Sequence, residues 1–454
     1  MSELSIVSRH ALTVLTGQLA VMAYGITDTI VAGRHAQESL AALSVGSAIF
    51  ISVYVALMGM LQALLPIWAE QRGARAPGAI GRSLRQSLYL CLAASALGMG
   101  VLLSPGALLR WTEVPPALQA EVTAYLAVLA LGLPSALLFR TYCTLNQALG
   151  HPQLVTWLQV AGLALKVPLS IWFTFGGAGL APQGAVGCAW ATLAVGYLQL
   201  ALALWLLRTQ HLYRALDIWR PLERPDWAQL GAFLRLGLPA GLSIMVEVTS
   251  FTLMALFIAR QGTLAAASHQ IAANLTAVVY MVPLSLGIAA SARVSYWRGA
   301  GNEAQARHVA WMGFRLTALM GCALAALLFV VRAPLAGLYS SSASVVALTT
   351  ALLGWVAAAH VGDAVQTLCA FVLRSYRVTV APLAIYCLLL WGAGLAGGYV
   401  LAYQGVGPWS GQAPTPAPFW FANGLALAVT AALFTAMLRR TLVRHMTPIR
   451  SVPE

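Results

Sequence analysis

The chain has 454 residues, of which 60% are hydrophobic and only 9% are charged, and its mean hydropathy is +0.78. A soluble globular protein carries about 25% charged residues, so this chain has too few charges to cover a water-facing surface. Its formal net charge of +13 would suit nucleic-acid binding only if the basic residues formed one face, but they lie in short segments between apolar runs. The composition therefore predicts an integral membrane protein with lipid contacts and no nucleic-acid partner.

Twelve apolar stretches are long enough to cross a membrane, which takes roughly 20 mostly apolar residues. They cover residues 11–32, 40–66, 86–109, 119–143, 153–175, 184–207, 231–258, 267–292, 309–330, 345–371, 380–403 and 418–438. The longest polar connection, 208–226, divides them into two sets of six. We therefore predict an all-α polytopic membrane protein of twelve transmembrane helices in two six-helix lobes, residues 1–207 and 227–454, joined by a cytoplasmic linker at 208–226.

The basic residues are distributed unequally between the two sides of the predicted membrane. Twenty-one arginines fall in one set of loops and the two tails, four arginines fall in the other set, and Lys166 lies inside the fifth span. Cytoplasmic loops carry the excess of Lys and Arg in membrane proteins. This split predicts a multi-pass protein of the inner (plasma) membrane with both termini in the cytoplasm.

The two sets of six spans share a weak internal similarity. Cys143 and Cys369 are 226 residues apart, and each lies late in the fourth span of its half. The tripeptide Arg-Gly-Ala recurs at 72–74 and 298–300 with the same offset. We interpret the halves as a parallel repeat, an arrangement in which transporters often bind substrate near the membrane midplane.

Three of the 13 acidic residues lie well inside predicted spans, away from the span ends: Asp28, Glu247 and Asp363. A carboxylate at the centre of a membrane-spanning helix costs roughly 2.5–3.5 kcal/mol on insertion scales, so such residues usually face a wet cavity, a partner or an ion. Glu247 and Asp363 both belong to the second half, and two carboxylates in a low-dielectric site share protons. Their oxygens also suit a hard cation such as sodium. We predict no bound cofactor and no metal other than a sodium ion at this pair.

Lys166 is the only lysine in the chain, and Asp28 is the only acidic residue well inside a span of the same half. A buried ammonium needs a carboxylate partner or loses its proton. The count therefore suggests an internal ion pair between Lys166 and Asp28. The alternative is a lysine whose side chain extends along the helix to the membrane surface.

Aromatic residues recur in the spans, and three of them, Tyr54, Trp172 and Tyr280, are candidates for a substrate cavity. Their rings could hold organic cations by cation–π attraction. Packing or a position at the membrane surface explains such residues equally well. We expect a monomeric protein.

Four segments in chain order resemble motifs of one known transporter family. They are residues 27–33 (TDTIVAG), 184–192 (GAVGCAWAT), 236–239 (LGLP, followed by Glu247) and 373–377 (LRSYR, preceded by Asp363). The chain is similar in these segments to the multidrug and toxic compound extrusion family, and to its NorM type in particular. The resemblance extends from about residue 10 to 440.

The resemblance implies a secondary active multidrug efflux antiporter that works by alternating access. Such a protein would export small organic, mainly cationic compounds in exchange for sodium ions or protons. The resemblance further implies that Glu247 and Asp363 bind the coupling ion, with Asp28 as the acidic residue of the first half.

Two features depart from the family pattern. Lys166 and Ser170 stand where the family commonly has asparagine, and residues 340–344 read SSSAS where it often has acidic residues. A fixed cation beside Asp28 could replace a coupling ion in that half.

Two other functions are alternatives to a multidrug antiporter for this sequence. A lipid-linked precursor flippase of the same broad superfamily usually needs several cationic residues in its cavity, and here only Lys166 lies deep in a span. An intramembrane hydrolase is a rival of another class, but the glycine two residues before the Gly-Asp of an aspartyl intramembrane protease is missing ahead of Asp363. No GxSxG or phosphate-binding GxxxxGK[ST] motif is present.

Overall fold

A computed structural model describes residues 2–106, 116–177, 179–404, 409 and 414–445. These ranges consist of helices and their connections, with one isolated β-bridge between Gly177 and Leu180. Twelve helical segments in the described ranges are long and apolar enough to cross a membrane. The predicted all-α fold with twelve transmembrane helices is confirmed.

One compact unit is formed by residues Leu12–Gly241. Its helices are α1 (Glu3–His35) from Leu12 onward, α2 (Gln37–Gln62), α3 (Leu65–Gly73), α4 (Pro77–Leu103), α6 (Pro116–Ala148), α7 (Pro152–Phe175), α8 (Ala185–Thr209), the short 3-10 helix η1 (His211–Leu216) and α9 (Trp227–Ala259) up to Gly241.

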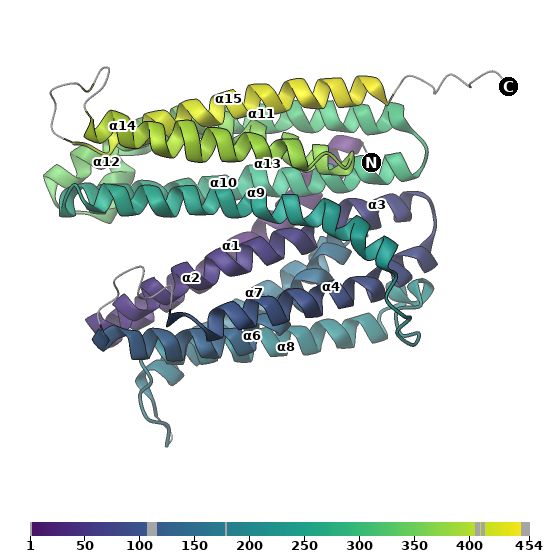
Figure 1. The fold of residues 1–454 in the computed structure, drawn as a ribbon, viewed down its shortest axis with the longest axis horizontal. Helices are drawn as coiled ribbons and strands as arrows, with labels where there is room; N and C mark the ends of the chain where they lie inside the picture. Colours follow the sequence, from purple (N-terminus) through teal and green to yellow (C-terminus); the bar gives the residue numbers. More distant parts are fainter. Residues whose placement is uncertain (1, 107–115, 178, 405–408, 410–413, 446–454) are drawn as a thin grey trace. The chain divides into compact units, whose positions relative to one another are not determined.

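The other compact unit combines Met1–Ala11 with Leu242–Glu454. Its helices are the first turns of α1, the remainder of α9, α10 (Thr263–Gly299), α11 (Glu303–Tyr339), α12 (Ala343–Ser375), α13 (Val380–Tyr386), the π-helical segment η2 (Cys387–Ala396), α14 (Gly397–Tyr403) and α15 (Ala417–Arg444). In Figure 1, α13 and α14 follow each other along one line, so the eleventh span is a single rod with a π-helical middle.

Each unit is organised around the fourth span of its half. In the first unit α6 packs against α2, α4 and α8, which are the second, third and sixth spans. In the other unit α12 packs against α10, α11 and α15, which hold the same places in their half. Cys143 and Cys369 are both buried in these central helices. The two units therefore repeat one packing pattern, as the offset of 226 residues suggests.

The recurring Arg-Gly-Ala tripeptide has a structural role in both units. Arg72, at the end of α3, donates from Nη1 to the carbonyl oxygen of Ala148, 3.4 Å away, at the end of α6. Arg298 donates from Nη1 to the carbonyl oxygen of Ser375, the last residue of α12. The last carbonyls of a helix lack partners inside the helix and attract cations. Repeat-related arginines thus cap the carboxyl ends of the two central helices.

Helix ends differ from the predicted spans where charge or proline interrupts the apolar run. The second span continues past residue 66 to Gly73, but Pro66 lacks an N–H and separates it into α2 and α3. The third span begins at Pro77 rather than residue 86, with proline at the first helical position. Its first turns carry Arg82 and Arg85, so an apolar window starts too late.

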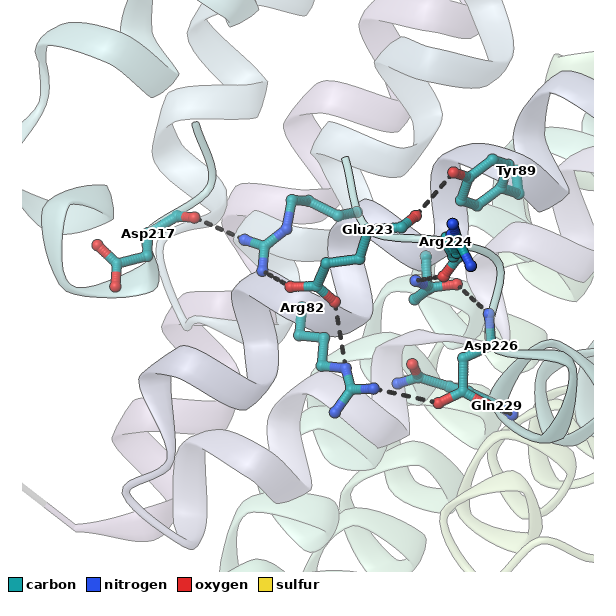
Figure 2. A network of polar contacts seen from close by, with 9 residues as sticks. Arg82, Tyr89, Asp217, Glu223, Arg224, Asp226 and Gln229 are labelled. Carbon is teal, nitrogen blue, oxygen red and sulfur yellow. Dashed lines mark hydrogen bonds and ion pairs between the residues drawn. The ribbon is translucent and has the colours of Figure 1, made fainter. Parts of the chain in front are cut away.

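The connection between the sixth and seventh spans is fixed to α4 by polar contacts. Arg85 donates to the carbonyl oxygen of Asp217 and to Oε1 of Glu223, both at 2.6 Å. The Nε atom of Arg82 lies 3.2 Å from Oε2 of Glu223, and its Nη2 atom lies 3.4 Å from Oδ2 of Asp226 (Figure 2). Because Arg85 donates a hydrogen bond to it, the pKa of the Glu223 carboxyl lies below its usual range. The predicted linker 208–226 is therefore an ordered part of the first unit.

Candidate functional site

The acidic residues of the second half meet at one amide group. Glu247 lies on α9 and Asp363 on α12. The Nε2 atom of Gln366 is 2.9 Å from Oδ1 of Asp363 and 3.4 Å from Oε1 of Glu247. Both carboxylates thus share one neutral donor. Within the described residues neither carboxylate has an ion-pair partner.

The orientation of the Gln366 amide is fixed from its other side. The hydroxyl of Tyr386, the last residue of α13, donates to Oε1 of Gln366. The oxygen of the amide is therefore the acceptor, and its nitrogen must face the carboxylates. Nε2 also lies 3.1 Å from Oγ1 of Thr367. The amide orientation follows from this hydrogen-bond chain.

Local helix geometry accounts for the cluster. Asp363, Gln366 and Thr367 are three and four residues apart on α12, which places them on one face of that helix. Tyr280 of α10 lies within electrostatic range of Glu247 and Asp363. The π-helical segment η2 starts directly after Tyr386, and π-helical insertions are frequent at functional sites.

In the first unit, Asp28 of α1 and Lys166 of α7 form a buried ion pair with an Nζ–Oδ1 distance of 2.8 Å. Lys166 is fully buried, so its side chain does not extend to the membrane surface. The ammonium also donates to the carbonyl oxygen of Cys188 at 2.8 Å and to Oγ1 of Thr192 at 2.7 Å. Since an ammonium has three donors, its hydrogen-bonding capacity is filled.

Close packing of α7 and α8 places these partners. An added Cβ on Gly187 would lie 2.5 Å from the carbonyl carbon of Phe173, so only glycine permits this approach. Cys188 follows directly and points its carbonyl at Lys166. Ser170, one turn after Lys166 on α7, donates to Oδ1 of Asp28 at 3.0 Å. Pro168 lies between them inside α7, where a proline interrupts the helical hydrogen bonds.

The three aromatic candidates lie in different surroundings. Tyr280 belongs to the acidic cluster of the second half. Tyr54 of α2 stacks on Phe50 with ring centroids 5.6 Å apart. Trp172 is 41% exposed near the end of α7, where it donates to the carbonyl oxygen of Gly177 at 3.1 Å. Among the described residues, the ring contacts of Tyr54 and Trp172 are with Phe50 and Phe173 rather than with either acidic site.

Sequence reasoning missed the neutral partners in the acidic site of the second half. Gln366, Thr367 and Tyr386 carry no formal charge, so a search for intramembrane acidic residues passes over them. Gln366 and Thr367 nevertheless follow Asp363 at helical spacing inside an apolar span. Polar residues in this pattern are the available signal.

Comparison with known proteins decides the family. The family model described as MatE matches residues 14–172 and 239–400, one stretch in each half. The chain belongs to the MatE family. The chain is 39% identical over 433 residues to a probable multidrug resistance protein NorM of Aromatoleum aromaticum, covering 95% of this chain and 92% of the relative. Against the multidrug resistance protein PmpM of Pseudomonas aeruginosa the identity is 31% over 446 residues, covering 96% and 91%.

Solved MATE transporters share the fold. An outward-facing multidrug resistance MATE transporter of the MOP superfamily matches with a TM-score of 0.88 at 17% identity, covering 99% of this chain and 98% of its own. A eukaryotic MATE transporter matches with a TM-score of 0.84 at 18% identity, covering 98% and 99%. The twelve spans and the membership of the MatE family make this chain a multi-pass transporter of the inner membrane.

Proposed function

We propose that this MATE protein is a secondary active multidrug efflux antiporter, which exports small organic compounds, mainly cations, by alternating access in exchange for sodium ions or protons. The observation that carries the proposal is the sharing of one amide nitrogen by Glu247 and Asp363. The relatives named as multidrug resistance proteins support the substrate class.

The shared amide leaves the charge of the two carboxylates uncompensated. Two ionised carboxylates in a low-dielectric site repel each other, and a neutral amide cannot compensate both charges. A proton or a sodium ion supplies the missing positive charge. Among the described residues, no three His, Cys, Asp or Glu side chains form a metal site. A sodium ion at Glu247 and Asp363 would therefore add neutral oxygens, for which Thr367, with its Oγ1 3.1 Å from the shared amide nitrogen, is a candidate.

The first half supports the same assignment by contrast. The ammonium of Lys166 already compensates Asp28 and uses all its donors. Asp28 therefore has a permanent counterion, and we place ion coupling at Glu247 and Asp363. Because its donors are occupied, the Lys166 ammonium is not free to bind a lipid pyrophosphate, which argues against a flippase.

We also propose that both termini are cytoplasmic and that the working unit is a monomer. The excess of arginine in one set of loops supports cytoplasmic termini. Each half has its own packed central helix, which supports a monomer as the working unit.

The test is transport of a fluorescent organic cation into proteoliposomes, with sodium and proton gradients imposed separately. Glu247→Gln and Asp363→Asn keep the side-chain shape but cannot exchange a proton or compensate a cation. Each should abolish gradient-driven transport while the protein remains folded by size-exclusion chromatography. Glu38→Gln, an exposed carboxylate at the start of α2, is the matched control and should transport normally.

Two outcomes would contradict the proposal. Undiminished gradient-driven transport by both Glu247→Gln and Asp363→Asn would remove these residues from coupling. Absence of cation flux in the unsubstituted protein under either gradient would point to another substrate class.

A further inference from the structure

A cavity of about 380 Å³ lies where the inter-half connection packs on α4, α6 and α8. Its wall is mostly aliphatic and includes Leu88, Leu145, Leu204, Ile218 and Leu222. The volume falls within the range of roughly 300–1,000 Å³ that small-molecule sites occupy. The cavity is therefore large enough for a ligand with an apolar portion.

The connection that closes this cavity is held in place. The buried side chain of Tyr213 donates to Oδ1 of Asn146 at 2.7 Å, and Leu216 is buried. An added Cβ on Gly81 would lie 1.7 Å from the carbonyl oxygen of Leu216, so the backbone of η1 approaches α4 closely. Together with the ion pairs of Arg82 (Figure 2) and of Arg85, these contacts make the cavity wall a fixed structure.

The cavity opens at the level where helices leave the membrane. Its wall includes the last turns of α6 and α8 and an early turn of α4. Trp219 covers its edge and donates to the carbonyl oxygen of Leu207 at 3.3 Å. Leu204 is 44% exposed and Trp219 56% exposed. Exposed leucine on a membrane-spanning helix faces lipid, and tryptophan favours the membrane surface. The opening is therefore accessible from the bilayer.

The rim of the cavity is cationic. Arg85 and Arg220 line the cavity. Arg85 is paired with Glu223, and Arg220 is paired with Asp217 at 2.7 Å in an exposed ion pair that leaves other guanidinium donors free. The guanidinium of Arg208 lies 5.9 Å from the centre of the Trp219 ring. In the described part of the chain Arg208 has no carboxylate partner. A ligand with an apolar tail and an anionic head fits this arrangement, whereas the cationic rim repels an organic cation.

We propose that this cavity binds an anionic phospholipid, with one acyl chain between α4, α6 and α8 and the phosphate at Arg208 and Arg220. Basic residues at the cytoplasmic membrane surface bind anionic lipids in this way. The lipid then packs against the same connection that joins the two halves of the chain. The proposal does not depend on the coupling site or on the exported substrate.

Photolabelling tests the proposal. The purified full-length protein in detergent is irradiated with phosphatidylglycerol carrying a diazirine on its acyl chain, and labelled peptides are identified by mass spectrometry. Labels should concentrate on residues 200–207 and 218–222, and unlabelled phosphatidylglycerol should displace them while phosphatidylcholine should not. In the double variant Arg208→Gln/Arg220→Gln the apparent affinity should fall on the order of thirtyfold, given the contribution of each arginine near a membrane surface.

Two further variants make the result decisive. Ala203→Phe places a bulky ring on the cavity wall, since Ala203 is a buried lining residue, and should suppress labelling of 200–207. The charge-matched control Arg260→Gln/Arg332→Gln should label as the unsubstituted protein does. Equal labelling by phosphatidylcholine, unchanged affinity in Arg208→Gln/Arg220→Gln, or displacement of the probe by a fluorescent organic cation would overturn the proposal.

Discussion

Replacing Asp28 by asparagine should destabilise the first unit strongly. In the Asp28→Asn variant the Lys166 ammonium keeps its contacts with Cys188 and Thr192 but loses its carboxylate partner at 2.8 Å. Removing one member of a buried ion pair costs roughly 3–5 kcal/mol, because it leaves an uncompensated charge. Since Lys166 is fully buried, water cannot replace the lost carboxylate.

The reciprocal change should cost a similar amount. Lys166→Asn leaves the Asp28 carboxylate with the hydroxyl of Ser170, which carries no compensating charge. The double variant contains no buried charge at this site. It should therefore lose no more stability than either single variant, which corresponds to a coupling energy on the order of 3 kcal/mol.

The measurement is a double-mutant cycle in which denaturant titration of the purified protein in detergent gives the free energy of unfolding. Transport is measured on the same four proteins. A matched cycle between Asp28→Asn and Arg85→Gln should be additive, because Arg85 is bound instead to Glu223. Additivity of Asp28 and Lys166 within about 0.5 kcal/mol would refute the reasoning.

Three further predictions address packing, pH and orientation. Gly187→Leu should destabilise the protein by about 1–3 kcal/mol, measured by thermal unfolding, because the side chain meets the backbone of α7. The pKa of Glu223 is lowered in the folded state by Arg85. Its contribution to stability is therefore present at neutral pH and lost as the pH falls below about 4.3 towards the folded-state pKa. Glu223→Gln should flatten acid unfolding between pH 6 and 3. In a cysteine-free variant, Glu38→Cys should react with an impermeant maleimide from outside, and cysteines at 208–226 should not; the reverse pattern would contradict the assigned orientation.

The twelve spans could be predicted because a lipid solvent imposes long apolar runs. The ends of the helices could not, since helices continue past the apolar stretch wherever charged residues find partners. The third span shows this: Arg82 and Arg85 belong to α4 and are paired with the inter-half connection. The same pairing is why residues 208–226, predicted as a linker, include the docked helix η1.

In the candidate sites, the charged residues could be predicted from the sequence, whereas their neutral neighbours could not. The count of charges in the first half predicts the pair of Asp28 and Lys166, and the structure places Nζ and Oδ1 2.8 Å apart. The roles of Glu247 and Asp363 in coupling stay a prediction. Their common neighbour Gln366 could not be predicted, because an uncharged amide gives no signal until three helices place it between two carboxylates.

The assignment of the first residues of the chain to the C-terminal unit has a consequence for biosynthesis. Residues Met1–Ala11 belong to the unit that contains Leu242–Glu454, where Val7 is buried and Glu3 accepts two hydrogen bonds of 2.6 Å from Arg293. At roughly 5–20 residues per second, Arg293 leaves the ribosome about 15–60 s after Glu3. For that interval the start of α1 lacks its final neighbours during insertion, so truncation or bulky fusion at this end should impair the C-terminal unit rather than the N-terminal one.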